Sequence, residues 1–161
     1  MTAVSINYND PVRELVVDVS ETIRVSTVVA NKIGVADTDT AAVVSLNSAG
    51  VNRDSDGLVF TLTLREVDRV AALALSGVPG GDSAAVELAY AESAVRDMTG
   101  VAIVAGQSPV TEIPDTTNPV VLSSTFDYND PVRKLVVYLS ETIEIDSVSV
   151  GGMNFDDVAA T

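Results

Sequence analysis

Carboxylate and amide oxygens are the side-chain groups whose types and spacing in this sequence could do chemistry. The chain of 161 residues contains no cysteine and no histidine. These absences exclude disulfides, thiolate or imidazole metal sites, and Ser-His-Asp or Cys-His catalysis. Paired carboxylates can hydrolyse glycosides, but sugar sites usually add aromatic platforms, and this chain has no Trp, 4 Tyr and 3 Phe. We therefore expect that the chain is not an enzyme.

The string NRDSDG, residues 52–57, is the most site-like part of the sequence. Its alternating oxygen side chains are Asn52, Asp54 and Asp56. Oxygen ligands at alternate positions before Gly57 resemble the opening half of a calcium loop. The bidentate glutamate that would close an EF-hand loop is replaced by Thr63. The alternative is a polar hairpin turn that joins residues 41–50 to residues 58–65.

A second candidate calcium site is the string Asn-Asp-Pro, which occurs at residues 9–11 and again at residues 129–131. Calcium could bridge carboxylates at a joint between domains, and the candidate ligands are Asp10, Asp127 and Asp130. The alternative is a turn in which Asn or Asp holds the backbone and proline presets φ. Calcium is thus the one cofactor that the residues suggest.

The charge balance limits the partners of the chain. Its 23 acidic and 9 basic residues give a net charge of −14, so nucleic acids and anionic membranes should be repelled. No apolar run approaches the length that spans a bilayer, so we expect no membrane insertion. An acidic surface with only two lysines, Lys32 and Lys134, is typical of proteins outside the cell.

An internal repeat organises the chain. Residues 8–23 and residues 128–143 differ at three positions: Glu14/Lys134, Asp18/Tyr138 and Val19/Leu139. The offset of 120 residues matches a whole domain and predicts tandem domains. We expect a complete domain at residues 1–110, a linker at residues 111–120 with two prolines, and an incomplete second copy at residues 121–161.

Alternating apolar residues predict many short strands. Leu15, Val17 and Val19 should point inward, which leaves Asp18 and its counterpart Tyr138 on the solvent side. Further strands are expected at these places: residues 4–8, 31–36, 41–47, 58–64, 85–90 and 101–106. Polar turns between short strands favour an all-β, antiparallel sandwich.

Two segments depart from this strand pattern. The spacing of Val67, Val70, Ala71 and Leu75 predicts a short helix within residues 65–75, with these apolar residues on the buried side. Residues 92–98 are expected to form another helical turn. Both are too short to make an alternating α/β protein.

Three short motifs stand out along the chain, and one of them occurs twice. They are Asp-Thr-Thr-x-Pro at residues 115–119, a Ser-Glu pair at Ser20–Glu21 and Ser140–Glu141, and Val-x-Asp-x-x-Gly at residues 95–100. Together they resemble the Ig-like repeats of large archaeal or bacterial cell-surface proteins. The helical insertion at residues 65–75 and a long middle segment depart from the common form of these repeats.

The resemblance implies an Ig-like β-sandwich that serves as a non-catalytic structural repeat module of an extracellular surface protein, such as a stalk, an S-layer or an adhesin. Its partners would be neighbouring copies of itself. Two alternatives stay open: a self-assembling filament subunit in which residues 121–161 donate strands to a neighbouring subunit, and a calcium- or glycan-binding adhesive module.

Overall fold

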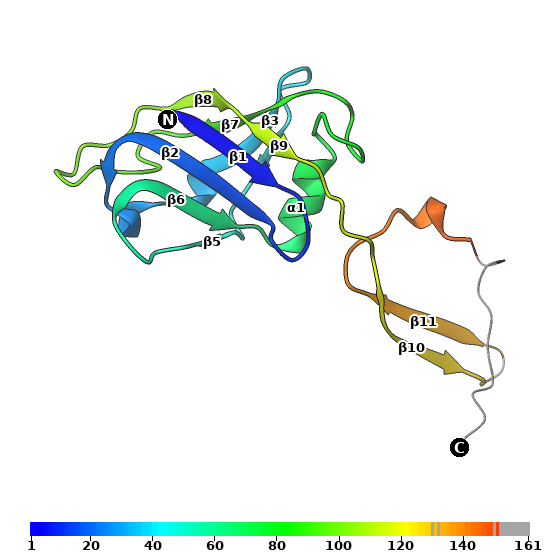
Figure 1. Ribbon diagram of the computed structural model, residues 1–161. Coiled ribbons are helices and arrows are strands. Elements are labelled where there is room, and N and C mark those ends of the chain that lie inside the picture. The colour runs from blue at the N-terminus through cyan, green and yellow to red at the C-terminus, as the bar shows by residue number, and fades with distance from the viewer. Residues whose placement is uncertain (130, 132, 150, 152–161) are drawn as a thin grey trace. The chain divides into compact units, whose positions relative to one another are not determined.

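The computed structural model describes residues 1–129, 131, 133–149 and 151. The chain divides into two compact units, Met1–Asn118 (unit one) and Pro119–Thr161 (unit two), and each is described by itself. Unit one holds nine strands: β1 (Ala3–Asn7), β2 (Glu14–Ile23), β3 (Ile33–Asp37), β4 (Val43–Ser45), β5 (Gly50–Val51), β6 (Gly57–Thr63), β7 (Val86–Tyr90), β8 (Gly106–Pro109) and β9 (Thr111–Ile113) (Figure 1). Its helices are α1 (Glu66–Leu73) and the 3-10 turns η1 (Val25–Thr27) and η2 (Ala30–Lys32).

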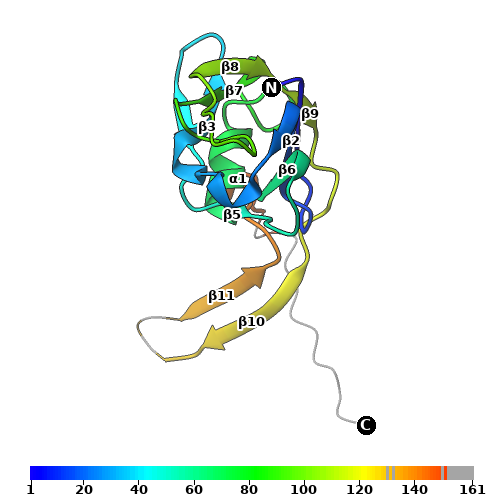
Figure 2. The ribbon, with the colours of Figure 1, turned by 90° about the vertical axis from the view of Figure 1, so that its left-hand side faces the viewer.

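The strands of unit one form two sheets. The five-stranded sheet has the order β5-β6-β2-β1-β9, and the four-stranded sheet has the order β4-β3-β7-β8. In Figure 2 strands β2 and β6 of the first sheet lie on one side of the unit, and strands β3 and β7 of the second sheet lie on the other. Neighbouring strands are antiparallel except β1 and β9, which run parallel. The chain therefore passes from one sheet to the other between β8 and β9.

The inner faces of the two sheets share one hydrophobic core. Ile6, Leu15 and Leu62 come from the five-stranded sheet, and Val35 and Leu88 come from the four-stranded sheet; none is more than 1% exposed. Burial of one such side chain contributes about 1.5–3 kcal/mol, so these alternating positions account for much of the stability of the unit. The all-β, antiparallel prediction is confirmed.

The duplicated segment behaves as its alternation predicts. Leu15 and Val17 are fully buried, and Val19 packs against the edge of the core. Asp18 is half-buried on the opposite side of β2, while its counterpart Tyr138 is 57% exposed. A charge and an aromatic ring can exchange here because neither enters the core.

One predicted strand is displaced along the chain. Residues 101–105 form a loop with one isolated bridge, Arg96 to Ala102, and strand β8 begins only at Gly106. The reason is a local turn, since the Asp97 carboxylate accepts hydrogen bonds from the backbone N–H groups of Thr99 and Val101. These bonds satisfy backbone groups that a strand would pair with a neighbour.

The helix is present, but the buried face predicted for it is wrong. In α1 the buried residues are Asp68, Arg69 and Ala72, whereas Val67 is 67% exposed. Charged residues can face inward because each finds a partner, and the hydroxyl of Ser48 donates to Asp68. No helix among the described residues is long and apolar enough to cross a membrane.

The second predicted helical turn, at residues 92–98, is not helical. A single turn closes from the Ala94 N–H to the Ala91 carbonyl, with Ser93 at φ 61°. Arg96 and Asp97 then form isolated β-bridges. A left-handed residue followed by extended backbone cannot continue a helix.

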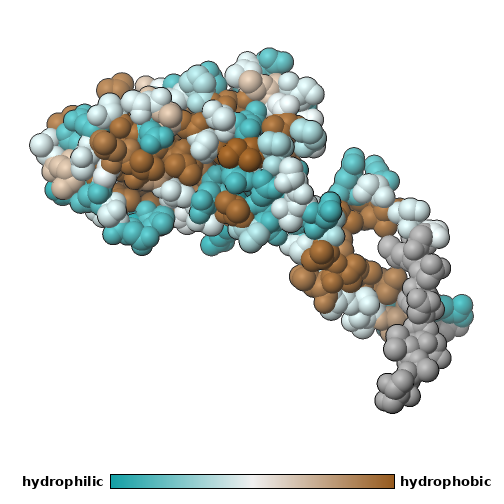
Figure 3. Space-filling view, viewed as in Figure 1, coloured by the Kyte–Doolittle hydropathy of each residue, from teal (hydrophilic) through white to brown (hydrophobic). Residues whose placement is uncertain are grey.

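Unit two contains strands β10 (Val121–Asp127) and β11 (Lys134–Leu139) and the 3-10 turn η3 (Ile145–Ser147). The pairing of Phe126 with Leu135 repeats that of Ile6 with Leu15, at an offset of 120 residues. The turn η3 likewise repeats η1 at the same offset. Figure 3 shows hydrophobic residues at the surface of this unit. Its large hydrophobic side chains that are exposed are Val120, Val121, Leu122, Tyr128, Tyr138, Ile145 and Val148.

The segment predicted as a linker contributes to the fold of unit one. Within residues 111–120, β9 pairs with β1 in the five-stranded sheet. The compact unit extends to Asn118, beyond the end at residue 110 expected from the sequence. Proline and threonine content indicates an extended segment, but not whether that segment lies against a sheet.

Candidate functional site

A network of polar side chains surrounds the point where the chain leaves unit one. We call it the linker clamp, and it consists of Tyr8, Asn9, Glu66, Arg69, Glu112, Asp115 and Thr116. Tyr8 and Asn9 follow β1, Glu66 and Arg69 lie on α1, and the others belong to β9 and the residues after it. The clamp therefore joins three parts of the chain that are far apart in sequence.

Arg69 is the centre of the clamp and is only 2% exposed. Its Nε and one terminal nitrogen donate to the two carboxylate oxygens of Glu66, each at 2.8 Å. The other terminal nitrogen donates to Asp115 at 2.8 Å and to the Tyr8 carbonyl at 3.1 Å. A buried guanidinium is tolerated only when it is paired and hydrogen-bonded in this way.

Asn9 holds the linker by its amide. Its Oδ1 accepts hydrogen bonds from the Thr116 backbone N–H at 2.8 Å and from the Thr116 hydroxyl at 2.9 Å. Its Nδ2 donates to the Pro114 carbonyl at 2.9 Å and to Asn7 Oδ1 at 2.8 Å. The Asn9 side chain thus forms hydrogen bonds with the backbone on both sides of Asp115, at Pro114 and Thr116.

Tyr8 and Glu112 make the third part of the clamp. The Tyr8 ring is fully buried, and its hydroxyl donates to Glu112 Oε1 at 3.1 Å. Burial of the ring, and next the Glu112 charge, raise the pKa of Tyr8 far above its usual value. The other Glu112 oxygen accepts from the Gly77 N–H at 3.2 Å, so this carboxylate also ties β9 to the loop after α1.

Two residues lie between the hydrogen bonds of the linker and the hydrogen bonds within unit two. The Thr117 N–H donates to Asp115, and its hydroxyl contacts Asn9 Oδ1 at 3.4 Å. On the other side, the Val120 N–H donates to the Ser140 hydroxyl within unit two. Asn118 and Pro119 separate these two sets of bonds.

Sequence reasoning did not find the clamp. The apolar spacing of α1 directed attention to Val67 and Val70, whereas the clamp residues on this helix are the charged Glu66 and Arg69. The available signal was the Glu66–Arg69 pair, three residues apart on one helix, together with an acidic residue in the proline-containing linker. That spacing is common on solvent-exposed helices, so it does not indicate burial.

The predicted residues of the NRDSDG string form the turn between β5 and β6. Asp56 Oδ1 accepts from the Val25 N–H at 2.8 Å, at the start of η1. Asn52 Oδ1 accepts from the Asp54 N–H at 3.1 Å, as in a polar turn. Asn52 and Asp54 line a small surface hollow, and Asp56 does not. The arrangement is that of a hairpin turn, and calcium binding by it stays a prediction.

The second set of calcium candidates is divided between the units. Asp10 forms an ion pair with Arg13 at 2.9 Å, and Asp127 accepts two hydrogen bonds from Asn129. Asp130 lies outside the described residues. Within the described part of the chain, no group of three or more acidic side chains is arranged to hold a metal ion.

Two of the motifs that carried the sequence resemblance, the Ser20–Glu21 pair and residues 95–100, come together in unit one. Ile23, just after the Ser20–Glu21 pair, forms a bridge with Asp97. Both segments line a cavity of about 130 Å³. Burial acts to raise the pKa of Asp97, but hydrogen bonds from Thr99 and Val101 outweigh it and the pKa is lowered. Asp97 therefore shapes a loop, which is a structural role.

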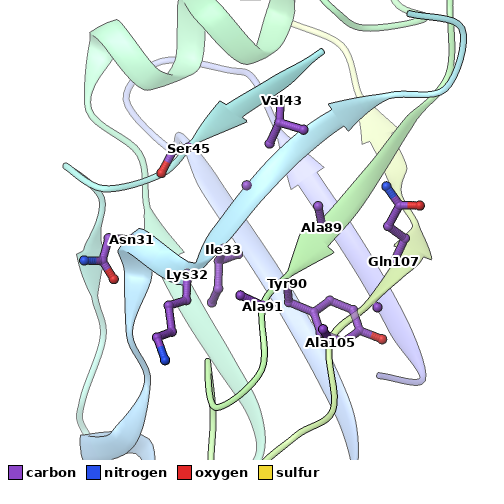
Figure 4. Close-up of a pocket in the computed structure, with 12 residues that line it drawn as sticks. Asn31, Lys32, Ile33, Val43, Ser45, Ala89, Tyr90, Ala91, Ala105 and Gln107 are labelled. Atoms are coloured by element: carbon purple, nitrogen blue, oxygen red, sulfur yellow. The ribbon is translucent and has the colours of Figure 1, made fainter. Parts of the chain in front are cut away.

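An open hollow of about 610 Å³ lies on the outside of the four-stranded sheet (Figure 4). Strand register places Ser45, Gly34, Ala89 and Gln107 in one row across β4, β3, β7 and β8. The hollow exists because the central members of this row are Gly and Ala. Lys32 is the charged residue of its lining, and its ammonium donates to the Glu92 carbonyl.

Comparisons with known proteins give one similar structure. No family model and no curated protein sequence matches the chain. Among solved structures, the crystal structure of a thermostable esterase is similar with a TM-score of 0.46 and 12% sequence identity. The similarity covers 80% of this chain and 39% of the esterase chain, so this chain spans about two fifths of that structure.

This comparison contradicts the function predicted from the sequence. The similar structure is described as an enzyme, and no comparison returns a repeat of a surface protein. The predicted non-catalytic structural module of a stalk, S-layer or adhesin is therefore not retained, and neither are its filament and adhesive alternatives. With this TM-score and identity, the esterase assigns no activity to the chain, and the absence of catalysis stays a prediction.

Proposed function

We propose that unit one is a linkage domain in a tandem array of Ig-like β-sandwich domains: it binds its own C-terminal linker and so fixes where the chain leaves the domain. The observation that carries this proposal is the linker clamp, in which a buried arginine, a tyrosine and an asparagine hold four linker residues. Holding the linker in this way does not depend on whether other domains of the array are catalytic.

The strand order supports the Ig-like assignment. Ig domains have one sheet in the order A-B-E-D and another in the order C-F-G, to which variable-type domains add C′ beside C. Taking β1, β2, β6 and β5 as A, B, E and D accounts for the larger sheet, and β4, β3, β7 and β8 correspond to C′, C, F and G. Strand β9 then continues G and pairs with A.

The repeated register supports the tandem arrangement. The hairpin β10–β11 has the residue pairing of β1–β2 at an offset of 120 residues, including Ser124 with Val137 as the counterpart of Val4 with Val17. The Arg133 N–H donates to the Asn129 carbonyl, as the Arg13 N–H does to Asn9. The partner of each domain would be a neighbouring copy of itself.

The short joint supports a restrained linkage. Between the bonds of Thr117 and those of Val120 the chain has only Asn118 and Pro119. The proline ring fixes its own φ, and it also restricts the residue before it to extended backbone. Few soft dihedrals therefore remain in this joint. The acidic, lysine-poor composition supports an extracellular location for such an array.

Pulsed electron spin resonance can test the linkage role. The chain has no native cysteine, so spin labels can be placed at Thr63→Cys in unit one and Ser124→Cys in unit two, both exposed positions. The proposal predicts a distance distribution that broadens at least about twofold when Asn9→Ala and Arg69→Met remove the clamp, because each lost hydrogen bond frees linker dihedrals.

The matched control is Arg53→Met, since Arg53 is exposed and its guanidinium contacts only the Ser26 carbonyl among the hydrogen bonds seen. This variant should keep the original distribution. If Arg69→Met alone reduces folding, Asn9→Ala still tests the clamp. An unchanged distribution in the folded clamp variants would overturn the linkage role.

A further inference from the structure

The outer edge of β10 has the features that bind β9 in unit one. There, β9 runs parallel to β1, with Ser5 opposite Thr111 and Asn7 opposite Ile113. The counterparts of Ser5 and Asn7 are Thr125 and Asp127 in β10. Among the described residues, β10 is paired with β11 on one side and with no strand on the other.

The tyrosine at the end of this strand differs sharply in exposure between the two units. Tyr8 is 0% exposed within the core of unit one, and its hydroxyl donates a hydrogen bond to Glu112 of β9. Its counterpart Tyr128 is 83% exposed, with its ring against Phe126 at a centroid distance of 4.5 Å. An exposed tyrosine at a strand end offers a phenol donor to a segment that would lie beside it.

The asparagine that follows is already held in the orientation used by the clamp. Asp127 Oδ1 accepts from the Asn129 N–H at 2.9 Å and from Asn129 Nδ2 at 2.7 Å. In unit one, Asn7 Oδ1 accepts the same two bonds from Asn9, at 2.9 and 2.8 Å. This arrangement turns the Asn9 Oδ1 toward Thr116, and it leaves Asn129 preorganised for an equivalent donor pair.

We infer that the free edge of β10, with Tyr128 and Asn129 at its end, is a docking site for an extended segment of the type Thr-Glu-x-Pro-x-Thr. The segment runs parallel to β10. Its glutamate accepts from the Tyr128 hydroxyl, and the N–H and hydroxyl of its last threonine donate to Asn129 Oδ1. The inference rests on the proposed tandem arrangement, since the occupant is a linker of the same chemistry as residues 111–116.

The free edge of β11 is the competing location. Its counterpart β2 pairs with β6 through backbone bonds and apolar side chains such as Leu62 and Phe60. Within the fully described unit one, no side-chain hydrogen bond joins β2 to β6, in contrast to the bonds between Tyr8, Asn9 and the linker. The β10 edge offers backbone pairing together with the side chains of Tyr128 and Asn129, which can distinguish one peptide sequence from another.

Nuclear magnetic resonance can test the site with a synthetic peptide. We would add acetylated, amidated Thr-Glu-Ile-Pro-Asp-Thr-Thr, the sequence of Thr111–Thr117, to the ¹⁵N-labelled chain of 161 residues. We expect saturable shifts of the amides at residues 125–129, with a dissociation constant on the order of 1 mM, since few hydrogen bonds offset the ordering cost. The amides of residues 5–9 should not shift, because β9 already occupies their edge.

Substitutions in the peptide leave the protein fold unaffected and make the test specific. Changing its glutamate to Ala, or its first threonine of the Thr-Thr pair to Val, should each weaken binding by about fivefold, the value of one hydrogen bond. Changing its aspartate to Asn should have little effect, because the partner of Asp115 is Arg69 of unit one. In the protein, Asn129→Ala should weaken binding, whereas Asn9→Ala should not.

Several results would overturn the inference. They are the absence of saturable shifts at 10-fold the expected dissociation constant, roughly 10 mM, shifts confined to β11, or equal binding of a scrambled peptide. The outcome is separable from that of the linkage role. Asn9→Ala disrupts the clamp of unit one and leaves the β10 edge intact, so either proposal can fail while the other holds.

Discussion

At the scale of single residues, the decisive feature is a charged side chain in a position that the apolar pattern assigns to solvent. Arg69 is buried because Glu66 and Asp115 neutralise it and the Tyr8 carbonyl takes a further N–H. Removing the charges of Arg69, Glu66 and Asp115 from water costs free energy. Their close ion pairs offset that cost but add little net stability. The clamp therefore contributes more to the position of the linker than to overall stability.

Removing one partner of the clamp should nevertheless be destabilising. We expect Arg69→Met to lower the free energy of unfolding by about 3 kcal/mol, because it removes the counter-charge 2.8 Å from Asp115 and leaves Glu66 with the more distant Arg13 at 3.6 Å. Urea denaturation at neutral pH measures this. Arg53→Met is the matched control and should change stability by less than about 0.5 kcal/mol. Equal effects of the two variants would contradict the structural role of Arg69.

The raised pKa of Tyr8 gives a prediction at alkaline pH. Because folding raises this pKa, the contribution of the neutral phenol to stability is complete below the unfolded value of about 10 and is lost as pH rises above it. Tyr8→Phe should be less stable than the original chain at pH 7, since Glu112 loses a donor. The stability difference should shrink toward pH 11.5 in urea titrations. A difference that does not change with pH would contradict this account.

At the scale of secondary-structure elements, apolar alternation predicted the strands and turns that border the core. Residues such as Leu15, Val17 and Phe60 are buried as expected because period-two patterning has a single solution when one face meets a core. The same reasoning misplaced β8 and the buried face of α1. In both cases polar groups bond to each other, and an apolar pattern does not record such bonds: Asp97 accepts from the nearby Thr99 and Val101 N–H groups, and Arg69 donates to the distant Asp115.

Strand β3 contains a glycine whose small size has a physical reason. A Cβ at Gly34 would lie 2.8 Å from Val43 Cγ1 and 2.9 Å from the Val44 carbonyl oxygen. We expect Gly34→Ala to weaken the β3–β4 pairing and to lower stability by about 1–3 kcal/mol, as overpacking does. Gly50→Ala is the control, because the nearest atom to its Cβ is 3.9 Å away. Thermal unfolding followed by circular dichroism separates the two variants, and equal midpoints would contradict the prediction.

At the scale of the whole molecule, the chain consists of one unit with a complete core and a second unit that repeats its first hairpin. The repeat was visible in the sequence because identical residues recur at an offset of 120. The extent of unit one was not visible, since β9 and the clamp lie in a segment with the composition of a linker. The amino-acid composition of a linker therefore does not tell whether the linker pairs with a sheet.

Truncation tests where unit one ends. A chain of residues 1–118 should fold with the stability of unit one, because it keeps β9, Glu112, Asp115 and Thr116. A chain of residues 1–110 should lose several kcal/mol, about 1 kcal/mol for each lost hydrogen bond and more for the uncompensated Arg69. Urea denaturation of both chains measures the difference. Equal stability would place the functional boundary at residue 110, as the sequence alone suggested.

The central claim is that the linker is part of unit one, and ¹⁵N relaxation of the full chain tests it most directly. If the clamp holds, the amides of Glu112, Ile113, Thr116 and Thr117 should have order parameters near 0.85, the value for rigid backbone. The amides of β1 provide the internal reference. Order parameters below about 0.6 at Thr116 and Thr117 would show a freely moving linker and would contradict the account.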